Sequence, residues 1–152
     1  MDNQIKKRVV IFDDDQTRRD SLTMLLNMCN DMECVGAFVS AANAVANVQA
    51  TQPDMVLMDI DMPLGDGITG TKKIKQNFPD LIVIMQTVFD DSQHIFEAIK
   101  AGANGYLLKK TSPDKLLEQI REAFQGGAPM TGAVAIKVLD FLGKNQFLLL
   151  TI

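Results

Sequence analysis

The chain has 152 residues, of which 47% are hydrophobic and 22% charged, and its formal net charge is −4. This balance fits one globular domain with a short extension, argues against a nucleic-acid surface on this chain, and leaves no apolar run long enough to span a membrane. Residues 1–8 are polar and basic, without a signal segment. We therefore expect a cytoplasmic protein in which Cys29 and Cys34 are reduced thiols.

Short apolar runs recur along the chain and predict strands. They lie at Val9–Phe12, Glu33–Val39, Met55–Met58, Leu81–Met85 and Tyr106–Leu108. The four apolar residues of Met55–Met58 are too few for a helix and suit a strand that is buried on both faces. Glu33–Val39 is less apolar, which predicts a position at the edge of the sheet.

Between these runs, apolar residues recur at helical spacing. Helices are expected to start at Gln16, at Ser40, after Gly67, at Ser92, at Pro113 and at about Thr131. Ser40 and Ser92 are predicted to cap their helices, and Ser112 followed by Pro113 is typical of a helix start. His94, the only histidine, is expected on the surface of its helix.

Strands thus alternate with helices five times. This pattern predicts a parallel sheet with helices on both faces, joined by right-handed crossovers. We assign the α/β class, with a flavodoxin-like, doubly wound sheet of five parallel strands in the order 2-1-3-4-5.

Polar side chains follow the strands at the edge where open α/β sheets bind ligands. Asp13 and Asp14 follow the first strand, Asp59 the third, Thr87 the fourth and Lys109 the fifth. Because the first and third strands are neighbours in the expected order, their carboxylates should converge. Two like charges ~4 Å apart repel by about 4 kcal/mol at an effective dielectric near 20. Such a cluster needs a cation or a raised pKa.

These groups point to phosphoryl chemistry. Oxygen ligands with little protein coverage suit Mg²⁺, and Mn²⁺ could substitute. Lys109 and the Thr87 hydroxyl would complete a clamp around a transferring phosphoryl group. No nucleotide-binding loop is present, so the group must come from another donor, and the available acceptor is a carboxylate. A small aspartyl-phosphate phosphatase is an alternative, because Asp61 lies two residues after Asp59, at the spacing of a general acid.

The chain resembles the receiver domain of two-component response regulators over about residues 7–127. Five motifs in the right order carry the resemblance: F-D-D, M-D-I-D-M-P with D-G, the threonine after the fourth strand, G-Y-L-L-K-K, and S-P-D-K-L. The resemblance implies that Asp59 accepts phosphate from a histidine kinase. It also implies that Asp13 and Asp14, with Asp59 and the backbone carbonyl of Asp61, hold Mg²⁺.

The same resemblance gives roles to the remaining site residues. Thr87 and Lys109 would contact the phosphoryl group, and Thr87 with Tyr106 would form the switch. The protein would not be an enzyme, but a phospho-acceptor that takes part in its own phosphotransfer and dephosphorylation. Asp15 should point away from the metal, because successive residues alternate as the strand ends. Receivers often have a cis proline after this lysine, so a cis peptide is expected between Lys109 and Lys110.

The phrases V-F-D-D, G-A-N-G-Y-L-L-K-K and Ala128-Pro129-Met130 are most similar to regulators with a LuxR-type (NarL-like) helix-turn-helix output. We expect a receiver domain over residues 1–127, a linker helix over 128–144, and the start of a truncated output domain, or a tail, over 145–152. Regulation of transcription, and any DNA binding, would then require an output domain absent from this chain. The alternative is a stand-alone receiver that acts by protein–protein contact. A homodimer would use the face of the fourth helix, fifth strand and fifth helix, or the first and fifth helices.

Overall fold

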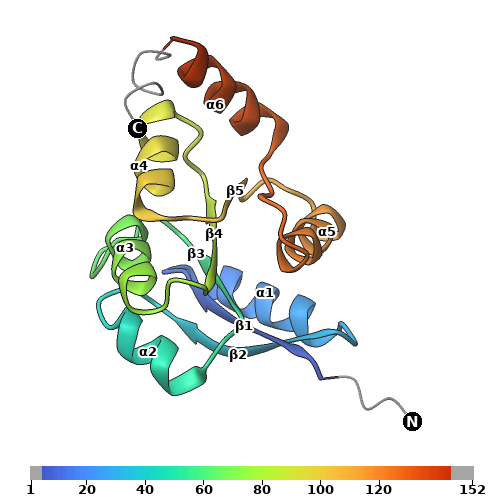
Figure 1. Ribbon diagram of the computed structural model, residues 1–152. Coiled ribbons are helices and arrows are strands. Elements are labelled where there is room, and N and C mark those ends of the chain that lie inside the picture. Colours follow the sequence, from blue (N-terminus) through green and yellow to red (C-terminus); the bar gives the residue numbers. More distant parts are fainter. Residues whose placement is uncertain (1–4, 145–152) are drawn as a thin grey trace.

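Residues 5–144, which the computed structural model describes, form five parallel strands and six helices (Figure 1). The strands are β1 (Lys7–Phe12), β2 (Met32–Phe38), β3 (Met55–Met58), β4 (Ile82–Thr87) and β5 (Gly105–Leu108). The helices are α1 (Gln16–Asn27), α2 (Ala44–Thr51), α3 (Gly67–Asn77), α4 (Ser92–Ala101), α5 (Pro113–Phe124) and α6 (Gly132–Lys144). The strand order is β2-β1-β3-β4-β5, which confirms the predicted topology with β2 at an edge.

Both faces of the sheet are covered, as the near-continuous apolar runs require. Helices α1 and α5 lie on one face and α2, α3 and α4 on the other (Figure 1). Side chains alternate between these two cores along each strand. The core under α1 and α5 contains Val9, Ile11, Met55, Leu57, Ile84 and Leu107. The opposite core contains Val10, Phe12, Val56, Met58, Val83, Met85, Tyr106 and Leu108. Within the described part of the chain, no helix is long and apolar enough to cross a membrane.

Two of the predicted helix caps are wrong. Helix α4 is capped by Asp91, whose carboxylate accepts the His94 N–H at 3.1 Å, and Ser92 is the first helical residue. Asp91 has the extended backbone that a cap needs, with φ −80° and ψ 151°, so the helix begins one residue later than expected. Helix α2 begins only at Ala44, and the Ser40 hydroxyl instead accepts the Ala42 N–H at 3.3 Å. Ser112 does cap α5.

The expected cis peptide between Lys109 and Lys110 is also wrong. Residues 5–144 contain no cis peptide bond. A cis bond before a residue other than proline costs about 3 kcal/mol. Lys109 reaches the carboxylates from a trans backbone, so nothing offsets that cost.

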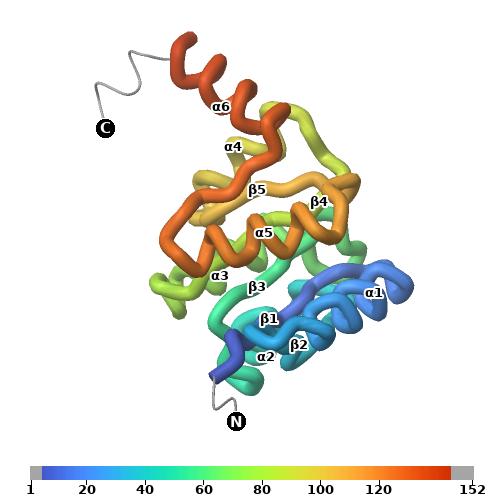
Figure 2. Tube along the Cα trace, turned by 90° about the vertical axis from the view of Figure 1, so that its right-hand side faces the viewer, coloured from blue at the N-terminus to red at the C-terminus, as the bar shows by residue number. Residues whose placement is uncertain are grey.

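Helix α6 and the segment before it pack against the sheet and α4. Met130 forms a parallel bridge with Tyr106, and the Tyr106 N–H donates to the Pro129 carbonyl at 2.9 Å. Val134 of α6 is fully buried in the same core as Tyr106. Figures 1 and 2 both show α6 beside α4, beyond the β5 edge of the sheet. The predicted start of an output domain at 145–152 lies outside the described residues.

Gly67 provides a test of the close packing that positions the β3–α3 loop. A Cβ atom on Gly67 would lie 1.8 Å from the Asp59 carbonyl oxygen, which is backbone and cannot move aside easily. We expect Gly67→Ala to lower the free energy of unfolding by about 2–3 kcal/mol. The matched control is Gly132→Ala, because no atom lies within 4 Å of its added Cβ. The control should change stability by less than about 1 kcal/mol. Urea denaturation of both variants measures this, and equal stabilities would contradict the packing described here.

Candidate functional site

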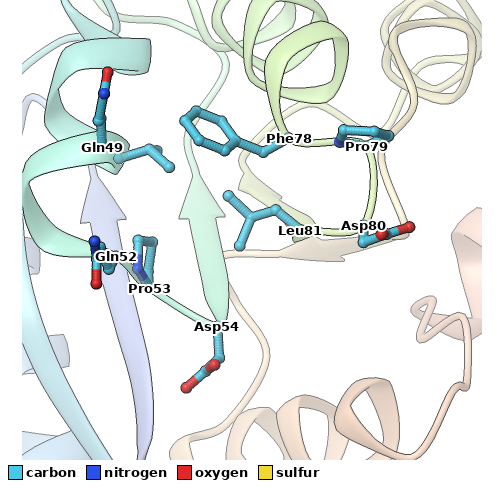
Figure 3. Close-up of a pocket in the computed structure, with 9 residues that line it drawn as sticks. Gln49, Gln52, Pro53, Asp54, Phe78, Pro79, Asp80 and Leu81 are labelled. Atoms are coloured by element: carbon cyan, nitrogen blue, oxygen red, sulfur yellow. The ribbon is translucent and has the colours of Figure 1, made fainter.

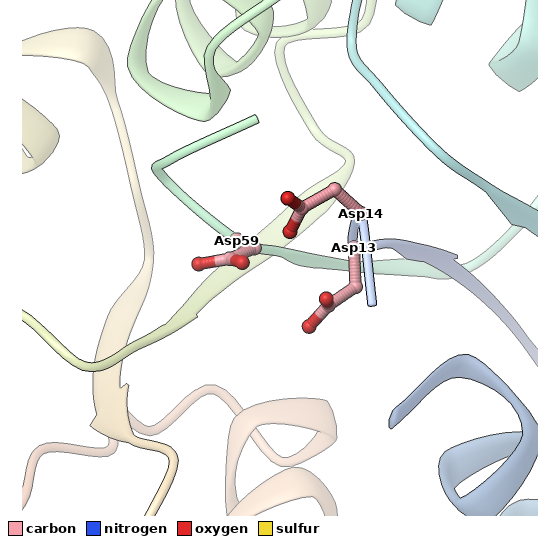
Figure 4. A group of neighbouring side chains, drawn as sticks. All are labelled: Asp13, Asp14 and Asp59. Atoms are coloured by element: carbon pink, nitrogen blue, oxygen red, sulfur yellow. The ribbon is translucent and has the colours of Figure 1, made fainter. Parts of the chain in front are cut away.

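Three carboxylates lie together at the carboxyl edge of the sheet (Figure 4). Asp13, Asp14 and Asp59 each offer an oxygen atom within 4.8 Å of the oxygens of the other two. The adjacent strands β1 and β3 position them, and the Asp59 N–H donates to the Phe12 carbonyl at 2.9 Å just beyond the last paired residues. Asp13 and Asp59 are only 2% and 4% exposed, whereas Asp14 is exposed. The structure thus confirms the predicted convergence.

Lys109 provides the compensating positive charge. Its Nζ donates to Asp59 Oδ2 at 2.8 Å and lies 3.0 Å from Asp13 Oδ2. The lysine comes directly after β5, and its backbone N–H donates to the Thr87 carbonyl at 2.8 Å. The pairing of β4 with β5 therefore fixes the Lys109 backbone, and the carboxylates of Asp59 and Asp13 bind its ammonium group.

Burial and ion pairing shift the pKa of Asp59 in opposite directions, and the same is true of the pKa of Lys109. Burial raises the pKa of Asp59 above its usual range, and the Lys109 ammonium only partly opposes that rise. At Lys109, burial alone would lower the pKa, but the hydrogen bonds to Asp59 and Asp13 outweigh it and the pKa is raised. The lysine therefore stays charged at neutral pH, and the Asp59 carboxylate is more basic than an exposed one.

The loop after β1 is fixed by contacts that the sequence analysis missed. Arg19, in the first turn of α1, donates from Nη1 to the Asp13 carbonyl at 2.7 Å. Asp13 Oδ1 accepts the Asp15 N–H at 2.9 Å. The Asp15 carboxylate caps α1 by accepting the Thr17 N–H at 3.1 Å, so this side chain serves the helix and not the acidic group. The only signal for Arg19 was its position one helical turn after Asp15.

The two predicted switch residues meet at Phe89. The Thr87 side chain is fully buried, and its Oγ1 accepts the Phe89 N–H at 3.4 Å. The Tyr106 hydroxyl donates to the Phe89 carbonyl at 2.7 Å, and burial raises the pKa of Tyr106. Thr87 and Tyr106 therefore contact the backbone of the same residue, one at its N–H and the other at its carbonyl. Phe89 also stacks on the His94 ring, with centroids 4.0 Å apart, and His94 is half-buried on α4.

Asp61 lies beside this group rather than within it. Its exposed side chain lines a hollow of about 430 Å³ between the β3–α3 loop and the start of α4, together with Asp66, His94 and Glu97. Its lining includes Ile60, the residue after Asp59, but none of the three grouped carboxylates. The metal contact predicted for Asp61 uses its backbone carbonyl, so it does not depend on where the exposed side chain lies.

A second hollow lies at the opposite edge of the sheet and is not part of this site (Figure 3). It measures about 480 Å³ and lies between the ends of α2 and α3, where Asp54 and Leu81 precede β3 and β4. Its lining includes Pro53, Phe78 and Pro79 but no lysine, arginine or histidine. This hollow lacks the charge pairing that distinguishes the carboxylate edge.

The donor set fits a small divalent cation that prefers oxygen ligands. Two of the three carboxylates already share one lysine ammonium, which leaves the group with a net negative charge. Asp14 is exposed and therefore accessible to a hydrated ion. The carboxylates of Asp13, Asp14 and Asp59 therefore form a candidate site for such a cation.

Comparison with known proteins points to one family. The profile of the response regulator receiver domain matches residues 9–121. YxjL, an uncharacterized transcriptional regulatory protein of Bacillus subtilis, is 36% identical over 146 residues, which are 95% of this chain and 67% of YxjL. The transcriptional regulatory protein DegU of Brevibacillus brevis is 37% identical, over 83% of this chain and 53% of DegU. The oxygen regulatory protein NreC of Staphylococcus epidermidis is 36% identical, over 91% of this chain and 65% of NreC. The chain thus spans between about half and two thirds of these relatives.

Solved structures agree. A two-component response regulator of the LuxR family from Aurantimonas superimposes with a TM-score of 0.83 at 26% identity, covering 90% of this chain and 97% of that one. A CheY-like receiver domain protein from Methanospirillum hungatei gives a TM-score of 0.74 at 28% identity, covering 80% of this chain and 96% of that one. These matches confirm the predicted fold and the predicted resemblance to receivers related to LuxR-type regulators.

The raised pKa of Asp59 makes stability depend on pH in a defined direction. A carboxyl whose folded pKa lies above its ordinary value of 3.8 stabilises the fold below that value, and this contribution is lost as the pH rises through the folded pKa. We therefore expect the stability of Asp59→Asn, which stays neutral, to rise relative to that of the wild type as the pH increases above about 4 in chelator-treated buffer. Thermal denaturation at several pH values measures the difference. A difference that is constant or shrinks with pH would falsify the assigned direction.

Proposed function

Because the chain belongs to the response regulator receiver domain family, we propose that it receives a phosphoryl group on Asp59 from a sensor histidine kinase in the cytoplasm. The observation that carries this proposal is the position of Lys109, whose Nζ lies 2.8 Å from Asp59 Oδ2 and 3.0 Å from Asp13 Oδ2. Such a fixed ammonium beside a buried carboxylate suits a site that takes up further negative charge.

The proposed step is an in-line displacement at phosphorus. A carboxylate oxygen of Asp59 attacks, the new O–P bond forms, and the P–N bond of phosphohistidine breaks. The bonding electron pair stays on the imidazole nitrogen, which is then protonated by solvent. The raised pKa of Asp59 favours this role, because a more basic carboxylate is a better nucleophile.

The surrounding residues stabilise the charge on the phosphoryl oxygens. Lys109 and the Thr87 hydroxyl would contact these oxygens. Mg²⁺ or Mn²⁺, bound by Asp13, Asp14 and Asp59, would supply the positive charge that lets a dianion approach three carboxylates. The protein is then a phospho-acceptor that takes part in its own phosphorylation and dephosphorylation, rather than an enzyme with a separate substrate.

The phosphatase alternative has less support. It needs a second carboxylic acid placed against the group on Asp59. The Asp61 side chain is exposed and lines the neighbouring hollow, outside the group that Asp13, Asp14 and Asp59 form. The position of Asp61 outside this group favours the phospho-acceptor over the phosphatase.

The response would be transcriptional and would use an output domain beyond this chain. The named functions of DegU and YxjL are in transcriptional regulation, and this chain spans 53% and 67% of those proteins. A stand-alone receiver that acts by protein–protein contact is the alternative.

For a homodimer, the side formed by α1 and α5 is favoured over the α4–β5–α5 face. Helix α6 covers part of α4, whereas Met24 and Met28 of α1 are 65% and 76% exposed.

Phosphate transfer from a small acyl phosphate provides the direct test. After incubation with acetyl phosphate and Mg²⁺, intact mass spectrometry should show one added phosphate on the wild type and none on Asp59→Asn. Asp80→Asn is the matched control, since Asp80 is an exposed aspartate at the opposite edge of the sheet and should leave the adduct unchanged. Equal adducts on the wild type and Asp59→Asn would refute the acceptor assignment.

A further inference from the structure

Gln86 is a polar side chain buried near the carboxyl end of β4, in a strand that is otherwise apolar up to this point. Four apolar residues precede it in the strand, and only 2% of its surface is exposed. Its side-chain Nε2 is buried and has no hydrogen-bond partner among residues 5–144. A buried donor without an acceptor is rare in folded proteins, because leaving the hydrogen bond unmade costs stability. An apolar residue would pack here without that cost, so packing alone does not explain a glutamine at this position.

The pairing of the strands places Gln86 beside Asp59. Strands β3 and β4 pair up to Met58 with Met85, so Asp59 and Gln86 are the next residues of two neighbouring strands. On its other side, Gln86 pairs with Leu107 of β5. Neighbouring strands lie about 4.8 Å apart, which is within the reach of a glutamine side chain. Gln86 is therefore the neighbour, on the β4 side, of the proposed phospho-acceptor.

Gln86 and Asp59 also lie on the same face of the sheet. On strands β3, β4 and β5, the last buried residues of the core under α1 and α5 are Leu57, Ile84 and Leu107. Side chains alternate between the two faces along a strand. Asp59, Gln86 and Lys109 each come two residues after one of these core residues, so all three belong to the same face. Thr87, one residue after Gln86, belongs to the opposite face.

The Lys109 side chain crosses β4 on this face. Lys109 follows β5 and Asp59 follows β3, and β4 lies between these two strands. The Lys109 ammonium nevertheless lies 2.8 Å from Asp59 Oδ2, so its aliphatic chain spans the width of β4. Gln86 is therefore the β4 residue that lies between the two members of this ion pair.

The hydrogen bonds of Asp59 and Lys109 leave room for a further donor. Asp59 Oδ1 accepts the Ile60 N–H at 2.8 Å and Oδ2 accepts Lys109, which are two of the roughly four acceptor positions of a carboxylate. Lys109 has three hydrogens to donate, and the carboxylates of Asp59 and Asp13 take two of them. A phosphoryl group brings three further oxygens to the site. An ammonium that turns toward those oxygens weakens its bond to Asp59.

We infer that Gln86 is a positioning residue for Asp59, and that its Nε2 donates to the Asp59 carboxylate when Lys109 turns toward the phosphoryl oxygens. The inference rests on the proposed function and adds one residue to it. The new hydrogen bond keeps the carboxylate charged and oriented until one of its oxygens attacks phosphorus. Before that step Lys109 occupies Asp59 Oδ2, and the Gln86 donor has no partner. Proteins keep such destabilising groups chiefly where function requires them.

Gln86→Met tests this role, because methionine has a similar length and volume but cannot donate a hydrogen bond. With limiting acetyl phosphate and Mg²⁺, intact mass spectrometry over time should show phosphorylation on the order of tenfold slower than in the wild type. The melting temperature of the unphosphorylated variant should rise by about 2–4 °C, because a buried donor without a partner has been removed. A role in folding alone would instead lower the rate and the melting temperature together.

Gln119→Met is the matched control. Gln119 is also a buried glutamine with an unpartnered side-chain atom, Oε1, but it lies on α5 and not on the strand beside Asp59. This control should be phosphorylated at the wild-type rate. A wild-type rate in Gln86→Met, a slower rate with a lower melting temperature, or an equally slow Gln119→Met would overturn the inference. A wild type that takes up no phosphate would instead overturn the proposed function on which the inference rests.

Discussion

The site depends on a single lysine ammonium that is shared by two buried carboxylates. Asp13 and Asp59 are almost inaccessible to water, and two unpaired charges in that position would destabilise the fold. Lys109 lies within 3.0 Å of both and partly offsets the cost of burying these charges, without neutralising the group. The site therefore retains the negative charge that attracts a divalent cation.

The parallel sheet holds Asp13, Asp59 and Lys109 in fixed positions relative to one another. Asp13, Asp59 and Lys109 each follow the last residue of a strand, and the strands are paired at their ends, so the three groups cannot separate without breaking the sheet. The side of the site toward β4 is different. There, the 88–91 loop is held by hydrogen bonds from Tyr106 and Lys137 and by the acceptor on Thr87. Residues 88–91 are thus held by individual side-chain contacts, whereas Asp13, Asp59 and Lys109 are held by strand pairing.

The sequence alone predicted the features of the fold and of the site that depend on local residue patterns. Apolar runs gave the strands, alternation gave the parallel sheet, and the residues after the strands gave the carboxylates and Lys109. Choices between adjacent residues were less predictable, as the cap at Asp91 rather than Ser92 shows. The local contact of Arg19 with the Asp13 carbonyl and the long-range contact of Lys137 with Asp90 could not be predicted, because both depend on side-chain reach in the folded chain. The docking of α6 on α4 is of the same kind.

Magnesium titration of a lysine variant tests most directly whether Lys109 compensates the carboxylate group. Lys109→Met removes the ammonium and leaves Asp13, Asp14 and Asp59 in place, so calorimetry should show Mg²⁺ binding several-fold tighter than in the wild type. Lys110→Met makes the same change in net charge at the exposed neighbouring residue and should leave the affinity unchanged. Unchanged or weaker Mg²⁺ binding by Lys109→Met would contradict the account, since the lysine would then not be the charge that balances this site.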